Sequence, residues 1–166
     1  MNLRNVLLLV SLLPLSAASL PGCAEPAPPT QATAETPATP GELPRIVVHK
    51  SPTCGCCNGW IAHLRESGFE VDARDEDDMR PVKARAGVPA GKHSCHTAFV
   101  AGYFIEGHVP AEDIKRLLAQ RPGAKGLAVP GMPLGSPGME MPDGRTQPYA
   151  VELVHRDGST AVFARH

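Results

Sequence analysis

The amino-acid sequence predicts a mixed α/β domain over residues 44–166. Short apolar runs alternate along this region with segments whose apolar residues recur at helical spacing, and small turn-forming residues separate the two kinds of segment. A dense group of cysteines lies where the first apolar run gives way to the first helical segment. These observations favour strands and helices in alternation around one core.

Residues 1–22 are predicted to be an export signal rather than part of the fold. Arg4 is followed by an apolar stretch that ends near Leu13, which is too short to cross a bilayer stably. The run Leu20-Pro21-Gly22-Cys23 resembles a bacterial lipobox, so Cys23 is the predicted lipidation site. Cleavage after residues 16–18 would instead release a soluble protein.

A tether is expected to follow over residues 23–43. This segment consists mainly of Pro, Ala, Thr and Glu and has almost no large apolar side chain. Such a composition cannot bury enough surface to offset the entropy lost on ordering, so the segment is predicted to be disordered. The remaining residues, 44–166, have the length of one domain.

Each element in the first half of the domain has a local signal. An apolar run predicts a buried strand, and residues 57, 60, 61 and 64 share one helical face that ends at Ser67-Gly68. Alternation then predicts a short strand, and a further helix ends at a glycine. The predicted elements are strand 45–49, a helix that follows the cysteines and stops at Ser67-Gly68, strand 69–71 and helix 79–86.

The second half begins with a hairpin and ends with another. Apolar residues flank Ala101-Gly102, and the Asp157-Gly158 turn lies between two apolar runs near the C-terminus. The expected elements are strands 97–100 and 103–105, helix 110–120 and strands 149–155 and 159–164. Residues 121–166 are therefore read as a Met/Gly/Pro loop and β-hairpin extension of a core over 44–120.

The predicted order of the core is strand, helix, strand, helix, hairpin, helix, with cysteines at the start of the first helix. This is the thioredoxin-like arrangement. In that arrangement Cys95 lies just before the first strand of the hairpin, at the place where thioredoxins carry a cis-proline that faces their cysteines. We therefore expect Cys95 to lie close to the cysteine group, with a buried free thiol as the alternative.

The cysteine group is Cys54-Gly55-Cys56-Cys57. Three thiols in so small a volume cannot all pair with one another, so metal binding or redox chemistry is expected. Cys54 and Cys57 keep the spacing of a redox-active disulfide motif, whereas Cys56 is an additional thiol that favours metal. Because thiolates are soft ligands and a helix N-terminus lowers the pKa of a thiol, Cu(I) suits this group.

Four long motifs carry a closer resemblance, over residues 45–166. The chain resembles the CopG-like family of periplasmic copper-resistance proteins, whose mark is a CxCC motif in a thioredoxin-like domain. The motifs are residues 49–57, 93–97, 106–110, and 129–133 with 136–140. The resemblance implies a polynuclear copper cluster bridged by thiolates, which cycles between Cu(I) and Cu(II) in copper resistance.

Four cysteines are the predicted copper ligands: Cys54, Cys56, Cys57 and Cys95. His96 and His108 are candidates for a ligand or a supporting group, with a structural role as the alternative. Met132 and Met139 offer soft thioether ligands, although methionine also fills irregular gaps in a loop. Met141 lies outside the family motifs.

Other conspicuous residues are given structural interpretations. His63 and His93 are expected to be solvated, and His49 either orients a thiolate or lies at the surface. The acidic run at 75–78 lacks the ligand spacing of a calcium loop and is interpreted as a solvated turn. Trp60 is expected to pack in the core.

The function predicted from the sequence is an envelope copper-binding protein, periplasmic and anchored by lipid. Its expected partners are copper ions and copper efflux or copper-carrier proteins, and the formal charge of −1 gives no electrostatic footprint for nucleic acid. The membrane would be reached only through the lipid anchor. Three activities stay open: copper oxidoreduction, passive Cu(I) sequestration or delivery, and thiol–disulfide exchange by Cys54 and Cys57.

Overall fold

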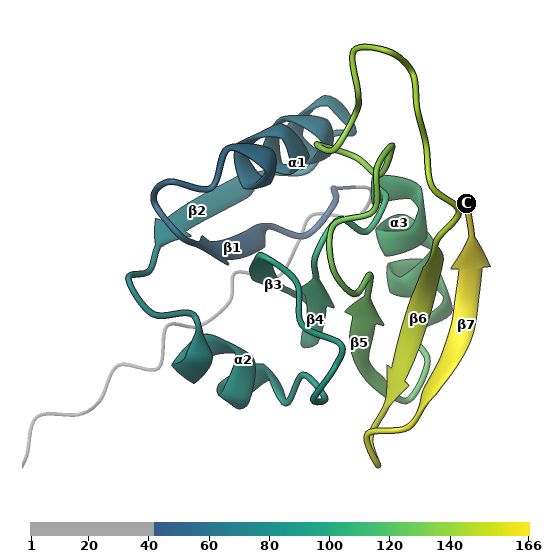
Figure 1. Cartoon of the computed structure of the whole chain (residues 1–166). Helices are drawn as coiled ribbons and strands as arrows, with labels where there is room; N and C mark the ends of the chain where they lie inside the picture. The colour runs from purple at the N-terminus through teal and green to yellow at the C-terminus, as the bar shows by residue number, and fades with distance from the viewer. Residues whose placement is uncertain (1–41) are drawn as a thin grey trace, which may run out of the picture. The chain divides into compact units, whose positions relative to one another are not determined.

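The computed structural model describes residues 42–166 of the chain. The predicted export signal, the lipidation site Cys23 and the tether up to residue 41 lie outside the described residues. Residues 42–166 form a mixed α/β fold with three helices and one seven-stranded sheet (Figure 1). No helix in this part of the chain is long and apolar enough to cross a membrane.

The elements follow the predicted alternation of strands and helices. Their bounds are β1 (Ile46–Lys50), α1 (Gly55–Glu66), β2 (Val71–Asp75), α2 (Arg80–Ala86), β3 (His96–Val100), β4 (Tyr103–Glu106), α3 (Ala111–Gln120), β5 (Ala124–Ala128), β6 (Ala150–His155) and β7 (Thr160–Arg165). Gly87 ends α2 in the left-handed conformation, as the sequence predicts for a helix that stops at a glycine.

The strands are arranged in the order β2-β1-β3-β4-β5-β6-β7. The pairs β1–β2 and β4–β5 are parallel, because a helix connects the two strands of each pair, and the other pairs are antiparallel. The C-terminal hairpin, β6 and β7, continues the same sheet through β5. The extension is thus part of the sheet that carries the predicted core.

Strand β5 is the element that the sequence did not predict. Its five residues, AKGLA, contain no β-branched or aromatic side chain, so the strand signal is weak. Gly126 also passes so close to the backbone of Phe104 in β4 that a Cβ atom would overlap the Phe104 carbonyl. Pairing with β4 and β6, rather than local propensity, therefore makes these residues a strand.

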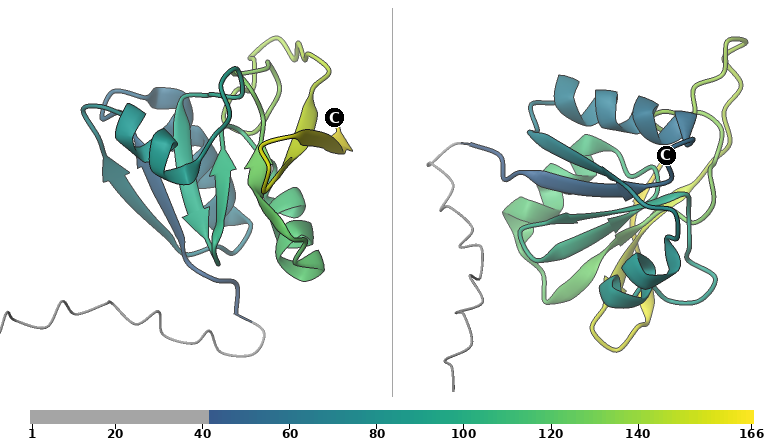
Figure 2. Two further views of the ribbon diagram at one scale, coloured as in Figure 1. Left: turned by 90° about the horizontal axis from the view of Figure 1, so that it is seen from below. Right: turned by 90° about the vertical axis from the view of Figure 1, so that its left-hand side faces the viewer.

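Helices cover both faces of the sheet. The right-hand view of Figure 2 shows α1 and α2 on opposite sides of the strands. Helices α1 and α3 share the main core with the inward residues of β1, β3 and β4, and the predicted stripe of α1 is buried there. Trp60 is fully buried, as predicted, and its indole N–H donates a hydrogen bond to the Val109 carbonyl at 2.8 Å. Burying a side chain of this size stabilises the fold by a few kcal/mol.

Candidate metal centre

Three of the candidate ligands lie at the first turn of α1. Cys54 precedes the helix in an extended conformation, and its backbone N–H closes a turn onto the Ser51 carbonyl at 3.1 Å. Cys57 is fully buried, whereas Cys54 and Cys56 are half-buried. The turn after β1 thus presents sulfur atoms at the positive end of the α1 dipole, which favours thiolates.

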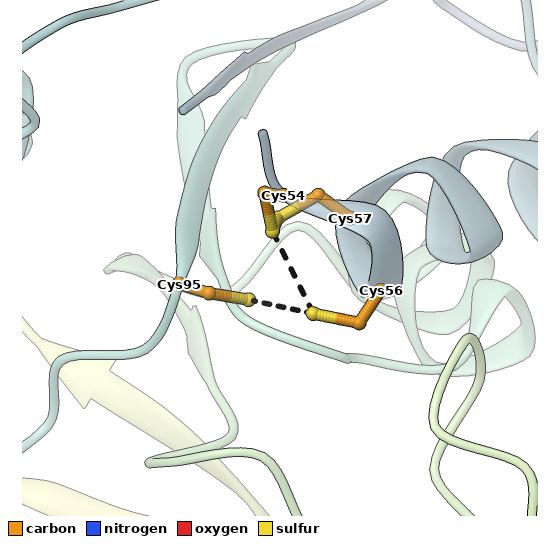
Figure 3. A group of neighbouring side chains, drawn as sticks. All are labelled: Cys54, Cys56, Cys57 and Cys95. Carbon is orange, nitrogen blue, oxygen red and sulfur yellow. Dashed lines mark hydrogen bonds between the residues drawn. A yellow bond between two sulfur atoms is a disulfide. The ribbon is translucent and has the colours of Figure 1, made fainter. Parts of the chain in front are cut away.

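The sheet register brings Cys95 to the same place. His96 in β3 pairs with Lys50 in β1, so Cys95 lies just beyond the end of β1, where the chain turns into α1. The Sγ atoms of Cys95 and Cys56 are 3.9 Å apart, and those of Cys56 and Cys54 are 3.6 Å apart (Figure 3). All four sulfur atoms lie within 4.8 Å of one another. The predicted convergence of the four cysteines is confirmed.

The four cysteines are not chemically equivalent. Cys54 and Cys57 form a disulfide, while Cys56 and Cys95 are free thiols. Figure 3 shows the disulfide at the start of α1, with Cys56 and Cys95 facing each other beside it. A disulfide sulfur cannot serve as a thiolate ligand, so all four cysteines can bind metal only after this bond is reduced.

Two buried histidines extend the group around Cys95. The Cys95 Sγ lies 3.1 Å from His108 Nε2 and 3.2 Å from His96 Nδ1, and these three residues form a second set that could hold a metal ion. The His96 ring packs on Trp60 at 4.3 Å between centroids, and its buried Nε2 has no hydrogen-bond partner among the described residues. Both histidines, which are the two candidates for a ligand or a supporting group, therefore contact Cys95.

The Met/Gly/Pro loop covers one side of the cysteines. Met132 Sδ lies 3.9 Å from Cys56 Sγ, and the neighbouring Gly131 bonds to the backbone of His93 and to the Ser94 hydroxyl. Met139 contributes backbone hydrogen bonds to Ser136 and Gly135 that shape the loop. Of the two candidate methionines, Met132 is the one with a sulfur contact to the cysteine group.

Burial sets the protonation of the groups around Cys95. Desolvation, and then the charge of Cys56, raise the pKa of Cys95 to about 12. Desolvation lowers the pKa of His96 to about 3 and also lowers the pKa of His108. At neutral pH the site therefore holds a Cys95 thiol and two uncharged imidazoles, so a metal that binds Cys95 must displace its proton.

An ion pair behind Cys95 was missed by the sequence reasoning. Glu106 is fully buried at the end of β4 and lies 2.5 Å from Lys83 Nζ of α2. Its carboxylate also accepts hydrogen bonds from the Thr97 hydroxyl and from the backbone N–H of Ser94, both at 2.6 Å. A glutamate that directly follows three apolar strand residues is the signal that could have revealed it.

Two histidines differ from expectation. His63 is not a solvated side chain: its Nε2 accepts a hydrogen bond from the Ala111 N–H at 3.1 Å and so caps α3, while desolvation lowers its pKa. His49 is buried and lies 2.6 Å from a carboxylate oxygen of Glu76, rather than at the surface. His93 is exposed, as predicted.

The acidic run comprises Asp75, the last residue of β2, and part of the loop before α2, and three of its members, Asp75, Glu76 and Asp78, form ion pairs. Asp75 bonds to Lys50, and Glu76 bonds to His49. The Asp78 carboxylate accepts a hydrogen bond from the Arg80 N–H at the start of α2.

Comparisons with known proteins identify relatives of this chain. The family described as "Protein of unknown function, DUF411" matches residues 92–139, which include Cys95, His96 and His108. A solved structure named "Copper resistance protein copG- Form 1" has 50% sequence identity and a TM-score of 0.71, and the match covers 75% of this chain and 98% of that one. The corresponding "Form 2" has 49% sequence identity and a TM-score of 0.72, and the match covers 75% of this chain and 99% of that one. No curated protein matches the chain.

Proposed function

The chain belongs to the CopG family of copper-resistance proteins, and from this premise we propose that it binds copper through Cys54, Cys56, Cys57 and Cys95. The observation that carries the proposal is the convergence of these four sulfur atoms within 4.8 Å. Their number and softness suit Cu(I), which prefers thiolate and thioether ligands. Copper is then the cargo or substrate of the protein.

The proposed site is polynuclear and bridged by thiolates. A metal–thiolate bond is roughly 2.3 Å long, so one ion can link two sulfur atoms up to about 4.6 Å apart. The separations of 3.6 and 3.9 Å around Cys56 fall within this span. Since all four sulfur atoms lie within 4.8 Å of one another, each reduced cysteine could bridge ions that it shares with its neighbours.

We further propose that the core over 44–120 is thioredoxin-like. The strand order β2-β1-β3-β4, with β1 and β2 parallel and β3 and β4 antiparallel, supports it. So does the placement of Cys54 before α1 and of Cys95 opposite, before β3. In this proposal Cys95 takes the position of the proline that holds an extended substrate in thioredoxins, so the site binds metal rather than peptide.

The proposed location is the bacterial envelope, with Cys23 as a lipid anchor. This rests on the apolar N-terminal segment and the lipobox-like run in the sequence. Copper efflux or copper-carrier proteins are the proposed partners.

We propose that the cluster cycles between Cu(I) and Cu(II), because mixed thiolate, imidazole and thioether donors suit both oxidation states. A reversible colour change with an oxidant and a reductant in stopped-flow spectroscopy would support cycling over passive sequestration.

Copper analysis of the reduced protein tests the binding proposal. We expect several copper ions per chain after purification from copper-supplemented cells and treatment with a dithiol. Cys56→Ser and Cys95→Ser should each lower this number, because each removes a shared ligand. His93→Gln changes an exposed residue near Cys95 and should leave the number unchanged. An unaltered copper number in both cysteine variants would reject the proposed site.

Thiol–disulfide exchange is the second candidate, favoured by the disulfide between Cys54 and Cys57. In this function Cys54 attacks a substrate disulfide and Cys57 resolves the intermediate. Insulin reduction separates the candidates. Full reductase activity in Cys56→Ser and Cys95→Ser, with copper acting only as an inhibitor, would favour the oxidoreductase.

A further inference from the structure

The disulfide divides the donor atoms into two groups. With Cys54 and Cys57 joined, the soft or imidazole donors that remain in contact are two cysteines, one methionine and two histidines: Cys56, Cys95, Met132, His96 and His108. We propose that the disulfide-bonded protein retains a site for a single thiophilic monovalent ion, held by Cys56, Cys95 and His108 beneath Met132. The redox state of Cys54 and Cys57 would then set how many copper ions the chain holds. This inference rests on the proposed copper-binding function.

His108 is already arranged as a metal ligand. Its Nδ1 lies 2.8 Å from the carbonyl oxygen of Pro137, and a carbonyl can only accept, so Nδ1 carries the proton and donates it. The lone pair is therefore on Nε2, which lies 3.1 Å from Cys95 Sγ. A backbone carbonyl that fixes one ring nitrogen in this way is the usual support for a histidine that binds metal through the other. Full burial of the side chain holds the ring in that orientation.

The sulfur atoms complete the donor set on the other side of Cys95. Cys56 Sγ lies 3.9 Å from Cys95 Sγ and 3.9 Å from Met132 Sδ, so it is placed between a thiol and a thioether. Both distances are shorter than the roughly 4.6 Å that one ion can span between two sulfur ligands. A Cu(I) or Ag(I) ion held between the two cysteine sulfur atoms would lie beside the Met132 thioether, which contacts Cys56, and beside the His108 imidazole, which contacts Cys95.

Solvent reaches the proposed one-ion site from the side of Met132. Met132 is 50% exposed, although it touches Cys56, whereas His108 and His96 are fully buried. An ion can therefore reach the sulfur pair from the Met132 side without unfolding the sheet. The thioether needs no deprotonation, so it can make first contact while Cys56 and Cys95 are still thiols.

The exchange between the two states is ordinary thiol–disulfide exchange with a small dithiol. The S–S bond between Cys54 and Cys57 breaks, both become thiols, and the dithiol becomes a disulfide, so two electrons and two protons are transferred. The two recovered thiols then join Cys56 and Cys95. The one-ion site would become part of the larger cluster.

The test is a metal titration of the full chain in both redox states. Cys23→Ser removes the fifth cysteine from the thiol count, so the oxidised form should show two reactive thiols after denaturation and the reduced form four. Ag(I), which does not cycle, and Cu(I) under anaerobic conditions are each titrated against a competing chelator. We expect one ion per oxidised chain and more than one per reduced chain.

Variants test the ligand assignment. The double variant Cys54→Ser/Cys57→Ser should bind one ion even with a dithiol present, because it keeps the donors of the proposed one-ion site and lacks the two thiols that the larger cluster needs. His108→Phe should weaken binding to the oxidised chain by at least about tenfold. His93→Phe is the control, since it alters an exposed histidine of the loop next to Cys95. Circular dichroism checks that each variant is folded.

The outcomes separate this inference from the proposed function. If the oxidised chain binds no ion while the reduced chain binds several, the one-ion site is wrong and the proposed function stands. Equal numbers of ions above one in both states would also overturn the inference. If neither state binds copper, the proposed function fails as well.

Discussion

Glu106 holds the chain on both sides of Cys95. Its buried carboxylate binds the backbone N–H of Ser94, directly before Cys95, and is neutralised by Lys83 of α2. The carboxylate also holds Thr97, two residues after Cys95. Both sides of the cysteine are thereby fixed to one charge that is shielded from water. Such a buried ion pair strongly destabilises a protein when only one partner is removed.

Glu106→Gln should therefore lower the free energy of unfolding by roughly 3 kcal/mol, because it leaves the Lys83 charge buried without its counter-ion. Urea denaturation of the metal-free protein measures the loss. Glu112→Gln is the matched control, since Glu112 pairs with Lys115 at the surface with 79% of its side chain exposed. That exposed pair is expected to contribute less than about 1 kcal/mol. Similar losses in the two variants would contradict the role given to Glu106.

Helix α1 and the Met/Gly/Pro loop meet where Gly59 of the helix contacts Gly138 of the loop. A Cβ atom at Gly138 would lie 2.5 Å from the backbone nitrogen of Trp60 and 2.6 Å from the carbonyl oxygen of Cys56. Gly138 also has a φ of +83°, which disfavours any other residue. Close contact between this loop and α1 holds the preceding Pro137 carbonyl against His108. The loop thus positions a histidine of the connection between β4 and α3.

Gly138→Ala should move this loop away from α1. Gly144→Ala serves as the control, because Gly144 has a φ of +71° but no atom within 4 Å of the added carbon. The control should lose about 1 kcal/mol of stability from backbone strain alone. Gly138→Ala should lose at least about 1 kcal/mol more, because of overpacking. Urea denaturation of the two variants makes the comparison, and equal losses would show that the loop does not press on α1.

Across the whole molecule, three histidines are kept uncharged by the fold. His63, His96 and His108 lie on α1, on β3 and in the connection before α3, and desolvation lowers the pKa of each. The unfolded chain takes up protons on these residues below its ordinary pKa of about 6.5, whereas the folded chain resists them. The folded state therefore binds fewer protons. Its stability must fall as the pH falls through this range.

His96→Phe tests this pH dependence. Because the folded pKa of His96 is about 3, wild-type stability should decrease from about pH 6.5 downward, and His96 should contribute about 1.4 kcal/mol per pH unit to the slope. Phenylalanine keeps an aromatic ring beside Trp60 and removes the titration. Urea denaturation of metal-free protein between about pH 6.5 and 5, above the range where carboxylates dominate, should give a shallower slope for the variant. His93→Phe should keep the wild-type slope, and an unchanged slope in His96→Phe would contradict the assignment.

Much of the fold could be predicted because its signals are local. The stripe of α1, the glycine that ends α2 and the Asp157-Gly158 hairpin depend on residues a few positions apart. Strand β5 has no such signal, since its place is decided by β4 and β6. The cap that His63 supplies to α3 was missed for the same reason, because its partner lies 48 residues away.

The sequence by itself determined which donor atoms the chain offers. Three crowded cysteines, a fourth before a hairpin and a methionine-containing loop indicate a soft metal, whatever their exact positions. Only the tertiary structure decided which atoms meet. It pairs Cys54 with Cys57, leaves Cys56 facing Cys95 across 39 residues of chain, and turns His108 Nε2 toward Cys95 through a carbonyl in the extension. The reason is physical: residue type fixes the donor atoms, whereas strand register and loop packing fix the distances between them.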